Sequence, residues 1–425
     1  MRAQEPATRA PERARKAPLS AIGPAILLTA TSVGAGDILT GSLAGSEAGI
    51  AILWAAPAGV LLKWTLNEGI ARWQMATGTT LLEGWVHKLG RWIQWVFFAY
   101  LLLFTIVTAG MLSSACGVAG AGLFPLGGLD RSRQLWGAIH SLAGLALVWG
   151  GGYALLKRVL AAGVGAMFAT VVLTAFLLAP DWPSAARGLV PHLPAGSAGW
   201  VVGLMGAIGG TVALISYGYW IREEGRTGRE GLRACRFDLM LSYTVIGLFG
   251  MAVVIIGSRV RLQGQGAGLA LRMADQLADA VGPFGKWTFL IGFWAAVFSA
   301  LLGVWQSLPY LFTDLIWLRA GSGIAKRGDV DVSRSVPYRA YLLFLATVPL
   351  VLLRWPVQKL QLAFGITGAT LLPLLALTLL MMNNRREWVG GEFRTGVLIN
   401  TVLAVALLFF LYVGAREILQ ILSRA

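Results

Sequence analysis

One stretch decides the fold: Thr31-Ser32-Val33-Gly34-Ala35-Gly36-Asp37-Ile38-Leu39-Thr40. It puts two glycines and a carboxylate in the middle of an apolar segment, residues 21–53, which is long enough to cross a bilayer as a helix. Charged side chains at that depth are rare and usually face a protein interior or a water-filled cavity, where they act on an ion or substrate. Glycines on either side of Ala35 allow the helix to stop and restart, which is tolerated where the freed backbone groups are buried or line a cavity. We therefore expect Asp37 to lie at a helix break that forms half of a solute site.

The composition identifies the class of protein. The chain has 425 residues, of which 56% are hydrophobic and 13% are charged, and its mean hydropathy is +0.69. Soluble domains carry about 25% charged residues, so this chain is an integral membrane protein. The net charge of +15 lies in short connections between apolar runs, where membrane topology and anionic lipid explain it and a nucleic-acid partner is not implied.

The apolar runs predict about eleven membrane-spanning helices and no strands. The expected spans are 21–49, 50–70, 93–116, 135–153, 159–178, 199–221, 239–257, 287–308, 338–353, 360–382 and 396–413. With the N-terminus inside, Lys and Arg favour the inner connections by about two to one, which predicts an outer C-terminus. The basic tail, 1–19, is expected to be a disordered cytoplasmic segment, and the amphipathic stretch 262–283 an interfacial helix at the outer surface.

A second glycine break follows five spans after the first, at Gly209 and Gly210 in the sixth span. An offset of five spans inverts the orientation in the membrane, so residues 20–190 and 191–383 are expected to form two inverted repeats of five helices. Residues 384–425 then add an eleventh helix. Paired broken helices at corresponding positions are the best sequence indication of a transporter site near the middle of the membrane. We thus take Gly34, Gly36, Gly209 and Gly210 as the helix breaks.

The first helix also carries small residues at intervals of four, Gly41, Gly45 and Gly49. Such a ridge allows another helix backbone to approach closely. We interpret it as a packing feature.

Several motifs resemble those of the NRAMP divalent-metal transporters. They are Gly23-Pro24, Gly34-Ala35-Gly36-Asp37, Thr40, Ala44-Gly45 and Leu53-Trp54 in the first helix, the connection from Ala71-Arg72 to Glu83, the sixth-helix run Gly209 to Ser216, and Asn384-Arg385-Arg386 to Gly391-Glu392-Phe393. The resemblance covers most of the chain. It implies the LeuT-type fold of five plus five helices and one extra helix, with transport by alternating access.

The metal-site motifs of the family depart from their usual form in this sequence. The family's D-P-G-N falls on residues 34–37, so that glycine stands at the aspartate position and Asp37 at the asparagine position. The family's M-P-H falls on residues 213–215, so that Ala213 replaces the methionine ligand, and the tenth-helix glutamine falls on Gly365. The acidic residues that move protons in the family's third helix have no counterpart in 93–116, which makes proton coupling doubtful.

The remaining donors predict the cargo. Loss of the thioether and retention of a carboxylate shift the expected preference toward harder ions such as Mg²⁺ or Mn²⁺, because oxygen donors suit them, and the expected cargo is Mg²⁺, Mn²⁺ or Fe²⁺. The predicted binding residues, beside Asp37, are Gly34, Ala35, Gly210, Ala213, Ser216 and Gln306, and His140 is a candidate proton relay. The alternative for Asp37 is capping of the second half-helix without any ligand.

The sequence therefore predicts a transporter of the inner membrane, not an enzyme, with no cofactor and a divalent metal as substrate. Membrane lipid is its other expected contact, and no obligate protein partner is evident. A second hypothesis keeps the fold but changes the cargo to a small organic solute such as an amino acid, whose carboxylate the half-helix N-termini would hold and whose amine Asp37 would hold.

Overall fold

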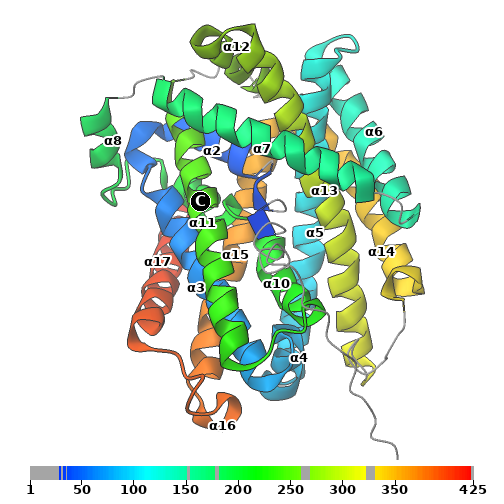
Figure 1. Ribbon diagram of the computed structural model, residues 1–425, viewed down its shortest axis with the longest axis vertical. Coiled ribbons are helices and arrows are strands. Elements are labelled where there is room, and N and C mark those ends of the chain that lie inside the picture. Colours follow the sequence, from blue (N-terminus) through cyan, green and yellow to red (C-terminus); the bar gives the residue numbers. More distant parts are fainter. Residues whose placement is uncertain are drawn as a thin grey trace, which may run out of the picture.

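The computed structural model describes residues 28–29, 32–34, 36–150, 154–177, 181–259, 269–321 and 331–422. Within these ranges every regular element is a helix, and the helices pack side by side into one bundle (Figure 1). The tail 1–19, predicted to be disordered, and Ala35 lie outside the described residues.

The helices follow the predicted order. The elements are η2 (Gly36–Thr40), α2 (Gly41–Ala48), η3 (Gly49–Ile52), α3 (Ala55–Thr77), α4 (Leu81–Gly84), η4 (Trp85–Leu89), α5 (Arg91–Leu123), α6 (Leu129–Gly150), α7 (Ala154–Leu177), α8 (Trp182–Gly188), α9 (Ala198–Ala207), α10 (Thr211–Glu223), α11 (Gly228–Arg259), α12 (Leu269–Val281), α13 (Pro283–Arg319), η6 (Val332–Arg334), α14 (Val336–Thr347), η7 (Val348–Arg354), α15 (Val357–Asn383), α16 (Arg386–Val389) and α17 (Val397–Leu422). Each predicted span corresponds to one helix or one broken pair of helices.

Several boundaries differ markedly from the prediction; α11, for example, begins at Gly228 where hydropathy predicts 239. The second span was expected at 50–70, but the chain bends by 106° between residues 37–52 and 55–77. Its helix therefore begins at Ala55 and runs on to Thr77. Helix α13 spans 37 residues where hydropathy predicts 287–308, because a helix does not end where the bilayer does.

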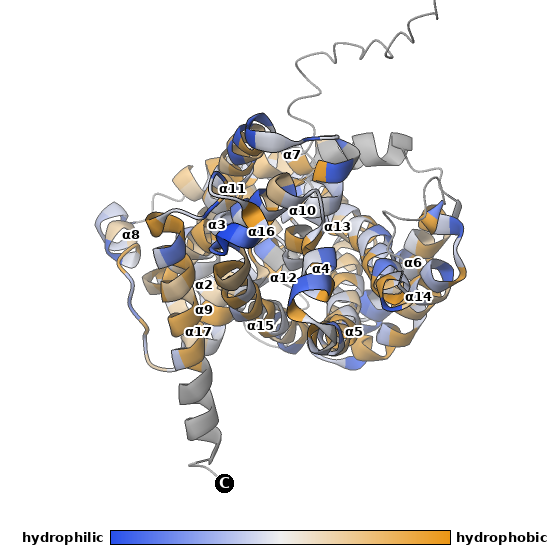
Figure 2. Ribbon diagram, turned by 90° about the horizontal axis from the view of Figure 1, so that it is seen from below, coloured by the Kyte–Doolittle hydropathy of each residue, from blue (hydrophilic) through white to orange (hydrophobic). Residues whose placement is uncertain are grey.

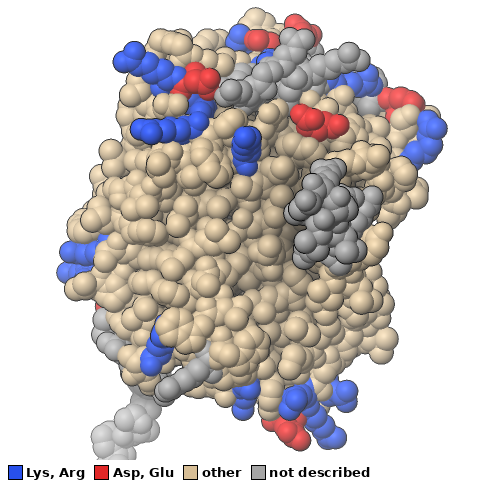
Figure 3. Space-filling model, turned by 180° about the vertical axis from the view of Figure 1, so that it is seen from behind, with Lys and Arg blue, Asp and Glu red and all other residues tan. Residues whose placement is uncertain are grey.

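The surface of the bundle fits a bilayer. Charged side chains gather at its two ends, and a broad, nearly uncharged band lies between them (Figure 3). Seen along the bundle, hydrophobic residues cover its sides while α4 and α16 carry hydrophilic ones (Figure 2). By length and hydropathy, five helices in the described ranges are able to cross a membrane, or up to seven if each bent pair counts as one span.

Helix α12 is amphipathic, as predicted for the non-spanning stretch. Its apolar face buries Met273, Ala274 and Leu277 completely, while Asp275 is exposed and bonded to Lys286. Figure 1 places α12 at the end of the bundle opposite to α4 and α16. Residues 260–268, the start of the predicted stretch, lie outside the described residues.

Ion pairs hold together the end of the bundle at which α4 lies. The Glu68 carboxylate accepts hydrogen bonds from Arg72, one turn further along α3, and from Arg236 of α11 at 2.7 Å. Arg222, in the last turn of α10, pairs with Glu83 of α4 at 2.6 Å. Glu68 is fully buried in this network.

Close backbone contacts fix α2 against α11. A Cβ atom added to Gly45 would lie 2.4 Å from the Val254 carbonyl oxygen, and one at Gly257 would lie 2.4 Å from the Ser42 carbonyl oxygen. Gly41 lies on the same contact, facing Val253. The predicted ridge is thus confirmed at its first two members. Gly49 instead takes a left-handed conformation with φ 70° and would meet nothing within 4 Å.

We expect Gly45→Ala to lower the melting temperature of the purified protein. The added methyl group meets a backbone oxygen, so one helix must shift, and such overpacking costs about 1–3 kcal/mol. The control is Gly165→Ala in α7, where a Cβ atom would meet nothing within 4 Å. Equal melting temperatures for both variants would show that the α2–α11 contact is not tight.

Candidate functional site

The sixth span is broken where the sequence predicts it. Helix α9 ends at Ala207 and α10 begins at Thr211. Between them, Gly209 and Gly210 have φ values of 72° and 59°, which side chains other than glycine rarely adopt. The two glycines therefore interrupt the helix and free its backbone groups in the middle of the bundle.

The first span is broken as well. The chain is not helical at Val33 and Gly34, and a short π-helical turn, η2, begins at Gly36. Gly34 is needed for packing, because a Cβ atom there would lie 2.8 Å from the Cβ of Ala300 on α13. The predicted break at Gly34 and Gly36 is confirmed.

Asp37 joins the two breaks. Its Oδ2 accepts a hydrogen bond from the Gly34 amide at 3.2 Å, and its Oδ1 accepts one from the Gly209 amide at 3.0 Å. The side chain is buried. Both bonds run to the breaks themselves, whereas the capping hypothesis expects the amides of the half-helix that follows. An ionised carboxylate accepts about four hydrogen bonds, so Asp37 keeps acceptor capacity for a cation.

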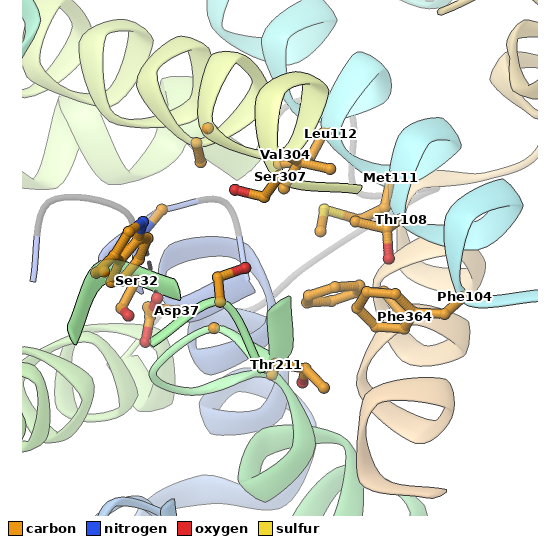
Figure 4. Close-up of a pocket in the computed structure, with 17 residues that line it drawn as sticks. Ser32, Asp37, Phe104, Thr108, Met111, Leu112, Thr211, Val304, Ser307 and Phe364 are labelled. Carbon is orange, nitrogen blue, oxygen red and sulfur yellow. Dashed lines mark hydrogen bonds between the residues drawn. The ribbon is translucent and has the colours of Figure 1, made fainter. Parts of the chain in front are cut away.

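A cavity of about 50 Å³ lies beside Asp37 (Figure 4). A water molecule needs roughly 10–15 Å³ on this scale, so the cavity has room for an ion with a few ligands. Its walls come from both breaks and from three further helices, α5, α13 and α15. The lining residues are Ser32, Gly34, Asp37, Phe104, Thr108, Met111, Leu112, Ala207, Gly210, Thr211, Ser216, Trp220, Ala300, Gly303, Val304, Ser307 and Phe364.

Three hydroxyl groups in this wall have no hydrogen-bond partner among the described residues. They belong to Ser32, Thr108 and Ser216, and all three are buried. Buried polar atoms in proteins are nearly always satisfied by protein or by water. Because these three face one cavity from three different helical segments, a polar or charged occupant would satisfy them.

Some of the predicted binding residues line this cavity and others do not. Gly34, Gly210 and Ser216 line it together with Asp37, as expected. Gln306 does not line it: the residue is exposed, and its neighbour Ser307 lines the wall instead. The reason is helical geometry, since one residue turns a helix by about 100°. Neither the side chain of Ala213 nor Ala35 is among the described parts of the structure.

His140 lies away from the cavity, on α6. Its Nδ1 bonds to the carbonyl oxygen of Trp136 at 2.7 Å, and its Nε2 bonds to the indole N–H of Trp294 at 2.8 Å. These partners make Nδ1 the donor and Nε2 the acceptor, so both nitrogens of the neutral ring are used. The arrangement is structural and gives no support to the predicted proton relay.

Two side chains near the site were not singled out from the sequence. Lys63 of α3 is fully buried, and its Nζ donates to the Gly206 carbonyl oxygen in the last turn of α9 at 2.8 Å. Met111 of α5 brings a thioether to the cavity; in the view of Figure 4 it lies across from Asp37. A lysine inside a predicted span is the same signal that singles out Asp37. No sequence signal assigns Met111, because it is one apolar residue among many in its helix.

The metal chemistry available is limited. Among the described residues, no group of three or more His, Cys, Asp or Glu side chains is placed to hold a metal ion. Asp37 is the one acidic side chain among those that line the cavity. A metal ion bound here would therefore depend on one carboxylate, hydroxyl groups, backbone carbonyls and water, the ligand set of a hard cation that keeps part of its hydration shell.

Known proteins were compared with this chain. The family model described as "Natural resistance-associated macrophage protein-like" matches residues 25–420. No curated protein matches the chain. A mutant of the manganese transporter of Eremococcus coleocola is similar in structure, with a TM-score of 0.72, 15% sequence identity, and coverage of 97% of this chain and 89% of that one. The same transporter in complex with an aromatic bis-isothiourea substituted compound gives a TM-score of 0.72 at 16% identity, covering 96% and 88%.

A more distant likeness is to MhsT in complex with L-phenylalanine, with a TM-score of 0.58, 17% identity, and coverage of 94% of this chain and 98% of that one. At such identities the similarity concerns the fold alone. The predicted LeuT-type architecture with broken first and sixth helices is confirmed.

We expect Asp37→Asn and Asp37→Ala to separate ligand binding from support of the breaks. Asparagine keeps one carbonyl oxygen for the Gly34 or Gly209 amide, so Asp37→Asn should keep most of the thermal stability, while Asp37→Ala loses both bonds and about 1–3 kcal/mol. If Asp37 binds the cargo, both variants lose cargo uptake into proteoliposomes. Normal uptake by Asp37→Asn would leave Asp37 with a structural role only.

Proposed function

Because this chain belongs to the Nramp family, we propose that it is a secondary transporter that carries a divalent metal ion across the membrane by alternating access. The observation that carries the proposal is the buried Asp37 carboxylate, which lies between two broken helices and faces a cavity with three unpartnered hydroxyl groups. A buried charge at such a site in a membrane is typical of a residue that acts on an ion.

The ligands favour a hard cation. Carboxylate, hydroxyl and carbonyl oxygens suit Mg²⁺ and Mn²⁺, whereas a thioether selects softer metals. Met111 supplies a sulfur atom to the wall, and Figure 4 places it apart from Asp37 and Ser32. We therefore propose that oxygen ligands around Asp37 hold Mg²⁺ or Mn²⁺, with Fe²⁺ as a weaker cargo, and that Met111 contributes to the cavity by its shape.

The membrane topology follows from the basic residues. We propose that the protein lies in the inner membrane with its N-terminus inside and its C-terminus outside, since Lys and Arg concentrate in the connections assigned to the inner side. The ion pairs around Glu68 and Glu83 then lie at the inner end.

A small organic solute is the second candidate cargo. Two features favour it. The cavity wall contains the aromatic side chains of Phe104, Trp220 and Phe364, and the site has a positively charged side chain, Lys63, as well as the negatively charged Asp37, to match the two charges of an amino acid. An amino acid would place its amine at Asp37 and its apolar part against the rings. A cavity of about 50 Å³ favours an ion, because it is small for such a molecule.

We expect Mg²⁺ and Mn²⁺ to raise the melting temperature of the purified protein and to enter proteoliposomes that contain it. A ligand that binds only the native state stabilises it by an amount set by concentration and affinity, about 2.7 kcal/mol at 100 times Kd. The panel should include Mg²⁺, Mn²⁺, Fe²⁺, Cd²⁺ and a set of amino acids.

Met111→Leu is the matched variant for this panel, because it removes the sulfur and nearly keeps the volume. We expect it to leave Mg²⁺ and Mn²⁺ uptake unchanged. Preferential uptake of Cd²⁺ that Met111→Leu abolishes would contradict the hard-ion proposal, and stabilisation by amino acids with no response to any metal would favour the organic cargo.

A further inference from the structure

Lys63 is a second buried charged side chain. It contacts the sixth-helix break on the α9 side, whereas Asp37 contacts the break at Gly209. Its Nζ donates to the carbonyl oxygen of Gly206 at 2.8 Å, whereas Asp37 accepts from the amide of Gly209. The stem of the lysine also passes the break, since its Cδ would lie 3.6 Å from a Cβ added to Gly209. Residues 207 and 208 thus lie between a backbone oxygen bound by the lysine and a backbone amide bound by the aspartate.

The Gly206 carbonyl is an electronegative position that any helix end creates. The last four carbonyls of an α-helix have no partner within it, and they carry the negative end of the helix dipole. In α9 the last turn is buried inside the bundle. That oxygen accepts instead from Lys63 and from the Thr211 hydroxyl at 2.9 Å.

In transporters with broken helices, freed carbonyls and half-helix C-terminal ends are the groups that coordinate a coupling cation such as Na⁺. Here the Lys63 ammonium occupies such a position at the end of α9. The negative charge of Asp37 attracts the Lys63 ammonium across the break, and the negative end of the α9 dipole favours a positive charge at the same place.

We propose that Lys63 is a tethered cation that takes the place of a monovalent coupling ion at the α9 end, so that the site closes on its cargo without bound Na⁺ or K⁺. The inference rests on the proposed transport function. Lys63 is a positioning residue: it holds the broken ends of α9 and α10 in register with Asp37, and it balances the charge of Asp37 when the cavity is empty.

The competing explanation is that Lys63 has a purely structural role and only satisfies the carbonyl oxygen of Gly206. Chemical rescue distinguishes these two roles. A cation-binding position from which the lysine has been removed accepts a small free cation, whereas the loss of a purely structural hydrogen bond is not restored by one. Lys63→Ala removes the ammonium and leaves room for a substitute. Lys63→Met removes the charge but fills the space.

The first experiment measures melting temperatures of the full-length purified protein in NaCl, KCl, ethylammonium chloride and choline chloride at equal ionic strength. We expect the wild-type value to be the same in all four salts. In choline chloride, Lys63→Ala and Lys63→Met should melt about 5 °C or more below wild type. Ethylammonium or Na⁺ should restore most of the loss in Lys63→Ala and none of it in Lys63→Met.

The control for this experiment is Arg133→Ala. Arg133 is another buried cation that donates to a backbone carbonyl, that of Leu353, at 2.9 Å, but it lies away from both breaks. Its variant should lose stability without ion-specific rescue by Na⁺ or ethylammonium. Rescue of Lys63→Ala that is no larger than that of Arg133→Ala would overturn the proposal.

The second experiment measures initial Mn²⁺ or Mg²⁺ uptake by proteoliposomes in Na⁺, K⁺ or choline media. We expect wild-type rates to agree within about 2-fold across the media, and Lys63→Ala to transport only where a small cation restores it. Wild-type uptake that falls 10-fold or more in choline would overturn the inference and leave the transport function standing. Absence of metal uptake by wild type in every medium would overturn the proposed function, and the melting experiment, which needs no cargo, would still test Lys63.

Discussion

The structure depends on where it places one carboxylate. Asp37 is buried among membrane-spanning helices, and its two oxygens accept amide hydrogen bonds from Gly34 and Gly209, one from each broken helix. Each break on its own would leave backbone groups unsatisfied in an apolar environment, which costs several kcal/mol per group. The carboxylate satisfies two of those groups together, and it ties residues 172 positions apart in sequence.

Charge balance follows from this constraint. A lone carboxylate at this depth would be expensive, and Lys63 lies at the other side of the same break to offset it. Asp37 and Lys63 thus place one acidic and one basic side chain at the same break. A divalent cation that binds Asp37 must compete with the Lys63 ammonium, which is covalently attached to the protein. This competition favours a cargo that keeps several of its own water ligands and is also bound by the unpartnered hydroxyls of Ser32, Thr108 and Ser216.

Ion pairs join the helices at one end of the bundle, whereas few hydrogen bonds join the broken half-helices at its centre. Charged pairs around Glu68 and Glu83 link α3, α10, α11 and α4 at one end of the bundle. Near the breaks, few bonds join the half-helices apart from those of Asp37, Lys63 and Thr211. Movement between inward- and outward-facing states is therefore expected to exchange the ion pairs at that end of the bundle, with the breaks as hinges.

The sequence by itself determined the class of protein, the number and order of its helices, both helix breaks and the importance of Asp37. Hydrophobic runs set by the thickness of a bilayer, and a charge in the middle of one, are local signals that a linear reading detects. Tertiary structure decided the rest. Whether Ser307 or its neighbour Gln306 faces the cavity depends on helix rotation. Whether His140 has free nitrogens depends on Trp294 of another helix. That Lys63 meets the end of α9, and Met111 the cavity, depends on which helices the bundle brings together, because contacts between distant segments have no periodicity in the sequence.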